Sequence, residues 1–110
     1  GGVTVTVGWM ASSAITGTIS LDAAFMSVTD DADDLDTKAF AAANNANAAP
    51  ASASGEVQYT TIAFTDGADM DSVAVGEYFR LQITRDADST TSTDDMVGDA
   101  ELVFVEIKET

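Results

Sequence analysis

Strict alternation of apolar and polar side chains is the feature that most limits how this chain can fold. In residues 77–85, the apolar Phe79, Leu81 and Ile83 are separated by Arg80 and Gln82. A two-residue period puts successive side chains on opposite faces of an extended backbone. The stretch therefore predicts a β-strand that turns Phe79, Leu81 and Ile83 toward the main core.

Two earlier stretches have the same period. Valines alternate with threonines over residues 3–7, and Trp9 continues the valine face. Residues 18–28 predict a second strand, because large or apolar residues fall on one face; these are Ile19, Leu21, Ala23 and Phe25. The β-branched and aromatic content of both stretches also favours strands over helices.

Residues 56–65 predict a strand whose large residues change face partway along. Val57 and Tyr59 fall on one face, whereas Ile62 and Phe64 fall on the other. One inserted residue reverses the alternation, so we expect a bulge or bend near residues 60–61.

The last predicted strand, residues 100–108, is apolar on both faces at its centre, which is Leu102, Val103, Phe104 and Val105. A strand of this kind is usually covered on both sides. The four residues could lie between two layers of the fold or meet another subunit. We take them as the candidate interface.

The remaining segments predict connections. Residues 37–55 contain many alanines, several asparagines and Pro50, and we expect a mostly extended excursion with a short strand or one helical turn. Residues 68–75 predict a helical turn held under a sheet edge by Met70 and Val73. Five strands joined by polar, turn-rich loops predict an all-β fold, an antiparallel β-sandwich or barrel. Residues 1–110 are expected to form one domain, and a start without methionine is compatible with a piece of a longer polypeptide.

The charge balance excludes several classes of partner. The chain has 19 acidic and 4 basic residues, giving a net charge of −15. Such a surface repels nucleic acid and anionic lipid, so neither is an expected partner. No apolar run approaches the roughly 20 residues of a membrane span.

The chain has neither histidine nor cysteine. The common nucleophile–base pairs and zinc sites need these residues, so we do not expect an enzyme. Aspartates in loops could bind calcium through their oxygens, and the candidate ligands are Asp31, Asp33, Asp69 and Asp71. None of the acidic runs has the spacing of an EF-hand, so we predict solvated loop charges and no metal site or other cofactor. Arg80 and Arg85 could hold an anionic ligand, but pairing with neighbouring acids such as Asp86 or Asp88 is the favoured interpretation.

The second half of the chain carries a resemblance. The segments Phe64-Thr65-Asp66-Gly67-Ala68-Asp69-Met70-Asp71, Phe79-Arg80-Leu81-Gln82-Ile83-Thr84-Arg85 and Gly98-Asp99-Ala100-Glu101-Leu102 resemble a structural module of tailed-phage virion proteins. The resemblance implies a jelly-roll-like β-sandwich, commonly assembled as a trimer, and it carries over no catalytic residue. Such modules usually have further strands before the position where this sequence begins.

Two hypotheses of function remain. The leading one is a non-enzymatic structural protein of the virion surface, either a fibre or a capsid decoration module. It would act by assembly with itself, as a homotrimer, and with other virion proteins, and host attachment stays open within this class. The alternative is a secreted or cell-surface adhesion module, extracellular in location, that binds calcium or carbohydrate.

Overall fold

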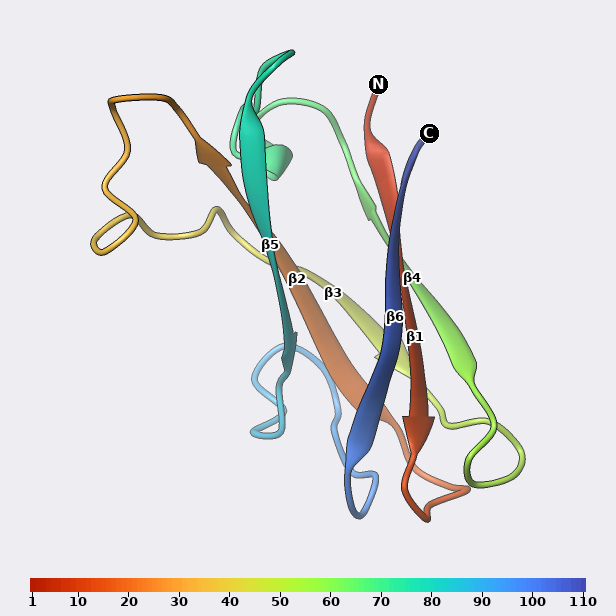
Figure 1. The fold of residues 1–110 in the computed structure, drawn as a ribbon. Coiled ribbons are helices and arrows are strands. Elements are labelled where there is room, and N and C mark those ends of the chain that lie inside the picture. Colours follow the sequence, from red (N-terminus) through yellow and green to blue (C-terminus); the bar gives the residue numbers. More distant parts are fainter.

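The computed structural model describes residues 1–110 and contains six strands and one short 3-10 helix (Figure 1). In chain order these elements are β1 (Val3–Ala11), β2 (Ile19–Val28), β3 (Asn44–Ala48), β4 (Gln58–Phe64), η1 (Ala68–Met70), β5 (Tyr78–Arg85) and β6 (Ala100–Glu109). They form two three-stranded sheets with the orders β4-β1-β6 and β3-β2-β5, and every pair is antiparallel. The predicted all-β, antiparallel β-sandwich is confirmed. A complete jelly roll has eight strands, and this chain supplies six.

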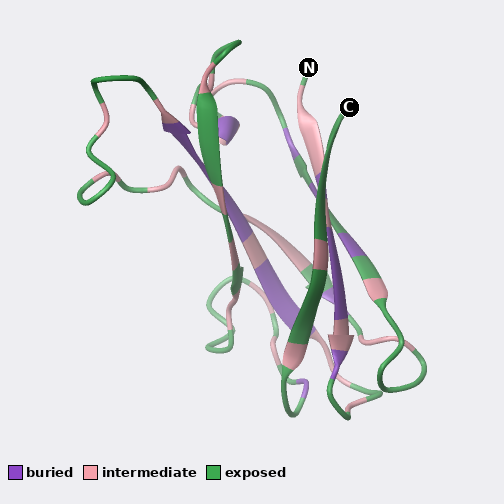
Figure 2. Ribbon diagram, in the orientation of Figure 1, coloured by how far each residue is buried: buried purple, intermediate pink, exposed green.

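The core lies between the two central strands. Val5, Val7 and Trp9 of β1 are at most 2% exposed, and Phe25 of β2 is completely buried. Figure 2 shows both central strands as the main buried elements. Phe25 meets Phe64 of β4 edge to face, with ring centroids 4.7 Å apart. The predicted inward faces of the first two strands are therefore confirmed.

The predicted bulge near residues 60–61 is wrong. β4 pairs with β1 in one unbroken register from Val3 opposite Phe64 to Trp9 opposite Gln58. The alternation does not reverse: Ile62 and Phe64 face the core, Tyr59 faces outward, and Val57 lies before the strand.

The register shift lies instead between β1 and β6. Gly8 is opposite Phe104 and Trp9 is opposite Leu102, so Val103 is the extra residue on β6. On the outer face, Tyr59 and Phe104 meet edge to face across Gly8, with ring centroids 5.0 Å apart. A side chain at Gly8 would overlap the Phe104 ring, so this close packing of an aromatic ring on the backbone requires glycine.

The long segment after β2 contains only the short strand β3, as expected. The predicted helical turn is present as η1, where Met70 is buried and Val73 packs against the core, but the turn contacts the central strand β2 rather than a sheet edge. No helix in the structure combines the length and hydropathy required to cross a membrane.

Candidate assembly surface

The side of the sandwich formed by β5 and β6 is the most unusual part of the surface. These strands are the edges of the two sheets, and they lie on the same side of the molecule, with β3 and β4 on the other (Figure 1). Each therefore has one row of backbone N–H and C=O groups with no neighbouring strand. Unpaired sheet edges of this kind are templates for pairing with another chain.

The strand β6 exposes apolar side chains along most of its length. Leu102 is 61% exposed, Val103 48%, Val105 39% and Ile107 39%. Leu102, Val105 and Ile107 are opposite the buried Trp9, Val7 and Val5, so they belong to the inner face of their sheet. An inner-face residue this exposed means that nothing in this chain covers the sandwich at β6. Of the two alternatives for this strand, a position between two layers of the chain is wrong, because the inner-face side chains of β6 remain exposed.

The strand β5 also leaves side chains of its inner face exposed. Leu81 and Ile83 are opposite Phe25 and Ala23 on β2, so their inward orientation is as predicted. They are only half-buried, however, and Phe79 is 42% exposed although its ring lies 5.3 Å from that of Phe25. The prediction that Phe79 lies in the main core is therefore wrong. The alternation identifies the face correctly, but burial also requires a covering layer that is absent here.

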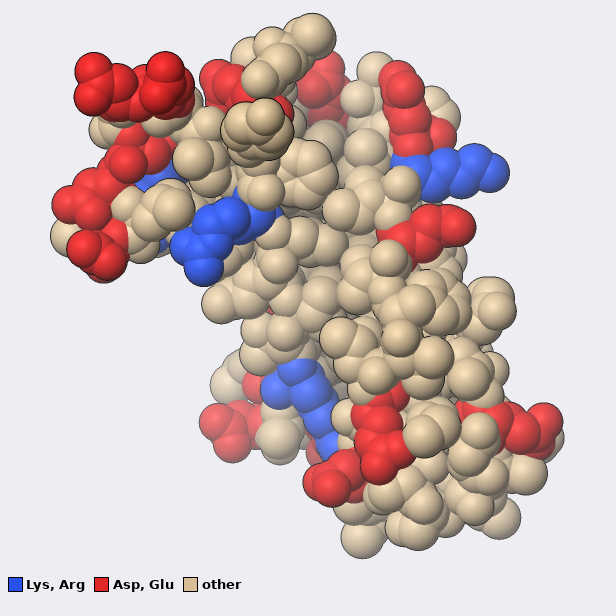
Figure 3. All heavy atoms as spheres, viewed as in Figure 1, with Lys and Arg blue, Asp and Glu red and all other residues tan.

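We call the surface formed by Phe79, Leu81, Ile83, Leu102, Val105 and Ile107 the open side. It continues inward to a groove of about 180 Å³ lined by Trp9, Leu21, Ile83 and Leu102, among others. The view in Figure 3 faces this side, and its centre is a band without charged side chains, with acidic residues gathered toward both ends. Large contiguous apolar surfaces are uncommon on monomeric proteins and typically mark interaction sites.

The sequence-predicted interface residues divide between two faces of β6. Leu102 and Val105 belong to the open side, and Val103 occupies the bulge. Phe104 points to the outer face, where it is partly buried against Tyr59 and Gly8. The sequence therefore located the exposed apolar strand, and its pairing with β1 decides which residues remain free.

An ion pair anchors the loop between β5 and β6 at one end of the open side. Arg85, at the end of β5, donates from Nε and Nη2 to the two carboxylate oxygens of Asp94, at 2.9 and 2.8 Å. It also donates to the carbonyl oxygens of Met96 and Gly98. The hydrogen bond from Arg85 holds the pKa of Asp94 below its usual value of 3.8. Arg85 thus pairs with an acid, as favoured from the sequence, but the partner is Asp94 rather than Asp86 or Asp88. These contacts fix the loop that joins β5 to β6.

The candidate metal ligands Asp33 and Asp71 are brought together, but around a lysine. The Nζ atom of Lys38 lies 3.1 Å from Asp33 and 3.3 Å from Asp71. It also donates to the carbonyl oxygen of Ser27 at 2.7 Å. Desolvation lowers the pKa of Lys38, yet its hydrogen bonds to the two carboxylates outweigh this, and the net shift is upward.

Backbone hydrogen bonds occupy the same two carboxylates. The Thr29 N–H donates to Asp33 at 2.6 Å and the Ser27 N–H to Asp71 at 2.8 Å, which lowers the pKa of each aspartate. The lysine ammonium and these backbone N–H groups therefore already serve as the partners of the two carboxylates. In a chain with only 4 basic residues, Lys38 comes two residues after a run of five aspartates in residues 30–36, and this proximity could have predicted an ion pair.

The other two candidates lie apart from this cluster. Asp69 accepts hydrogen bonds from the Thr65 N–H and from Asn44, so it fastens the turn at η1 to β3. Asp31 is exposed in a turn, with a left-handed backbone (φ 55°). No three side chains of histidine, cysteine, aspartate or glutamate are placed to hold a metal ion.

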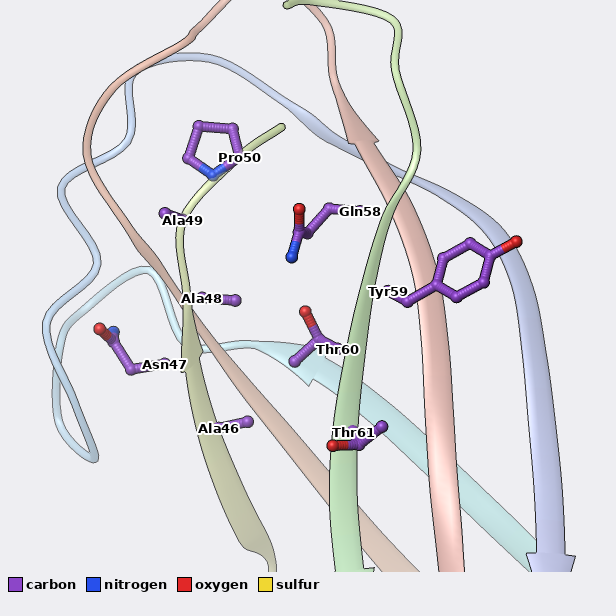
Figure 4. Close-up of a pocket in the computed structure, with 9 residues that line it drawn as sticks. All are labelled: Ala46, Asn47, Ala48, Ala49, Pro50, Gln58, Tyr59, Thr60 and Thr61. Carbon is purple, nitrogen blue, oxygen red and sulfur yellow. The ribbon is translucent and has the colours of Figure 1, made fainter. Parts of the chain in front are cut away.

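A second groove, of about 420 Å³, runs between the other two sheet edges, β3 and β4 (Figure 4). Its lining is small and polar, with Asn47, Gln58 and Thr60 among the residues. Tyr59, the one aromatic residue at its border, points away from β3 toward β1 and β6. The groove therefore has no aromatic platform on which a sugar ring could stack.

No protein family, no curated protein sequence and no solved structure matches this chain.

Proposed function

We propose that the protein is a non-enzymatic structural module of a virion surface that acts by assembling with further copies of itself, as a homotrimer. The observation that supports assembly is the exposure of inner-face residues on both edge strands. Leu102 at 61% and Phe79 at 42% face the interior of the sandwich and yet contact water. Covering such residues removes apolar area from water, at roughly 25 cal/mol per Å².

The location on a virion is supported by the resemblance to tailed-phage structural modules, which are commonly trimeric. A fibre and a capsid decoration protein use such a module in the same way, as a building block whose contacts are its activity. Other virion proteins are its further partners, and attachment to a host surface is compatible with the same assembly. Detection of this protein in purified capsids or tails is the test of location.

The test of assembly is the mass of the protein in solution. We expect light scattering at micromolar concentration and moderate salt to give three times the mass of the 11.3 kDa chain. A stable monomer under these conditions would contradict the proposal.

A single substitution tests whether β6 lies in the contact between copies. Leu102→Asp introduces a charge on the open side, at an inner-face residue of β6 that is 61% exposed. We expect this variant to stay folded and become monomeric, because a buried unpaired carboxylate is strongly disfavoured. Val75→Asp is the matched control, since Val75 is fully exposed in the connection before β5 and outside the open side.

An adhesion module that binds calcium or carbohydrate is the alternative. It requires folding or binding that depends on the ligand, and a calcium-specific rise in melting temperature would favour it over the assembly module.

A further inference from the structure

Each sheet has one unpaired edge on the open side, β6 in one sheet and β5 in the other. The direction of each edge strand limits what can pair with it. The sheets have the orders β4-β1-β6 and β3-β2-β5, so on the open side the position beside β6 in one sheet and the position beside β5 in the other are unfilled. A further strand in either position would extend that sheet and help to cover the open side.

Strand direction limits what can fill these positions. Antiparallel pairing requires an added strand to run opposite to β6 in one sheet and opposite to β5 in the other. β5 begins at the end of the molecule where β6 finishes, so these two strands themselves run in opposite directions (Figure 1). In a second copy rotated about an axis parallel to the strands, all directions are preserved. Its β5 then has the direction required beside β6, and its β6 has the direction required beside β5.

We propose that the open side is covered by a second copy of this chain, with β5 of one copy pairing antiparallel with β6 of the next. This inference rests on the proposed function, because it specifies how an assembly of identical copies is built. Rotation about such an axis closes a ring, so in a homotrimer each β5 edge and each β6 edge would have a partner.

The charges of the two edges support this pairing over its alternatives. β5 carries two arginines and no acidic residue; Arg85 is paired with Asp94, whereas Arg80 has no ion pair within the chain. β6 carries three glutamates and one lysine, which are Glu101, Glu106, Glu109 and Lys108. Pairing β6 with β6 would place glutamates of two copies along the same edge, and like charges on facing strands are destabilising. Pairing β5 with β6 instead places a basic edge beside an acidic one.

The positions of the charges agree with this arrangement. Arg80 is close to the beginning of β5 and Glu106 is close to the end of β6, and these ends lie at the same end of the molecule (Figure 1). In β5–β6 pairing without a large shift along the axis, the two side chains would approach each other across the contact. The apolar inner faces of neighbouring copies would meet around the axis and enclose the open side.

Charge exchange tests the pairing directly. We expect Arg80→Glu and Glu106→Arg each to raise the dissociation constant at least tenfold, since each places like charges on neighbouring strands. The double variant R80E/E106R should recover assembly to within about threefold of the unmodified chain, because every contact again joins opposite charges. Failure of the double variant to recover, with both single variants folded, would overturn the proposal.

Cross-linking identifies the strands in contact without relying on charge. The chain has no cysteine, so an introduced thiol is unique. One copy carries Gln82→Cys on the exposed face of β5, and a second, tagged for size, carries cysteine at 104, 106 or 108 on β6. After mixing and oxidation, we expect disulfides between the two kinds of copy at one or more of these positions. Thiols at Gln82 and at the exposed Thr61 of β4 are the control and should not combine.

The outcomes separate this inference from the proposed function. A monomeric unmodified chain overturns both. A trimer that forms β6–β6 or β5–β5 disulfides, or none between β5 and β6, overturns the pairing and leaves assembly standing. Recovery of a different polypeptide on the open side of the assembled particle also overturns the second copy as the occupant.

Discussion

Trp9 and Thr60 are joined by a hydrogen bond inside the core: the indole Nε1–H donates to the threonine hydroxyl oxygen at 2.9 Å. Trp9 is 2% exposed and Thr60 7%, so no water replaces this acceptor. Thr60→Val keeps the shape and removes the oxygen. We expect the free energy of unfolding to fall by about 1–3 kcal/mol, the cost of an unsatisfied buried donor. Urea unfolding measures it.

Thr61→Val is the matched control for that prediction, because Thr61 is the next residue on β4 and is exposed. Its effect should stay within about 0.5 kcal/mol. Equal losses in the two variants would show that β-strand propensity or packing, rather than the indole hydrogen bond, is responsible.

Gly8 should not tolerate a side chain while Phe104 is present. The methyl group of Gly8→Ala would overlap the Phe104 ring, and we expect a loss of about 1–3 kcal/mol from the resulting strain. Combining it with Phe104→Leu should recover part of the loss, because the smaller side chain can move aside. Additive effects in a double-mutant cycle would contradict direct contact between the two positions.

Phe25→Ala and Phe79→Ala should differ sharply in their effect on stability in a monomeric background such as Leu102→Asp. Phe25→Ala empties a completely buried site, and a loss of about 3–5 kcal/mol is expected. Phe79→Ala should cost only about 1–2 kcal/mol, because the residue is already 42% exposed. Thermal or urea unfolding of the two variants measures both losses of stability. If Phe79→Ala lowers the free energy of unfolding as much as Phe25→Ala does, Phe79 is covered within a single copy.

The ion pair of Arg85 and Asp94 should stabilise the protein only when the aspartate is charged. The pKa of Asp94 is lower in the folded state than its usual 3.8. A depressed folded-state pKa gives stability that is present above the unfolded-state pKa and lost as the pH falls through the folded-state value. Asp94→Asn should therefore cost about 2 kcal/mol near pH 7, and the difference from the unmodified chain should shrink below about pH 4.

Unfolding in urea at a series of pH values from 7 to 2.5 tests the Asp94 prediction. Asp88→Asn is the control, since Asp88 is exposed in the same loop. A difference between Asp94→Asn and the unmodified chain that stays constant down to the lowest pH would mean that the charge of Asp94 is not its source.

Added salt should stabilise the fold by screening, with no specific need for calcium. The chain has a net charge of −15, so its acidic side chains repel one another. Mobile cations of any kind screen this repulsion. We expect the melting temperature to rise similarly in calcium, magnesium and sodium salts at matched ionic strength. A large rise in millimolar calcium alone, reversed by a chelator, would indicate a dedicated site, because ligand binding stabilises in proportion to RT ln(1 + [L]/Kd).

Features that depend on local sequence were predicted well. The inward faces of β1, β2 and β5 follow from a two-residue period, and this period needs no knowledge of the partner strand. The bulge could not be located, because an extra residue is defined only against the strand it pairs with. Tyr59 and Ile62 are three residues apart, so regular alternation alone puts them on opposite faces, and the outward Tyr59 packs against Phe104 of β6.

The polar contacts also divide into those that local sequence predicts and those that depend on the tertiary structure. The sequence favoured a structural partner for Arg85, but the choice of Asp94 over the adjacent Asp86 depends on how the loop folds back to β2, where Asp94 also accepts from the Ser20 N–H. The centre of β6 was predicted as a candidate interface because it is apolar on both faces. Its position at a sheet edge, on the same side of the sandwich as β5, follows only from the topology.

The position of the two chain ends determines how the module would respond to pulling. β1 and β6 are antiparallel neighbours, and the Thr110 N–H donates to the Gly2 carbonyl oxygen at 2.9 Å, so both ends leave the same end of the molecule (Figure 1). A force applied between the ends would act along these perpendicular hydrogen bonds and load them one at a time. The pair would therefore separate by unzipping at low force, whereas a load applied between Gly2 and the far end of β6 would shear all the bonds together. In an assembly that places β5 of a neighbour beside β6, the free edge of β6 would also be hydrogen-bonded. Unzipping β6 from β1 would then require these additional bonds to break.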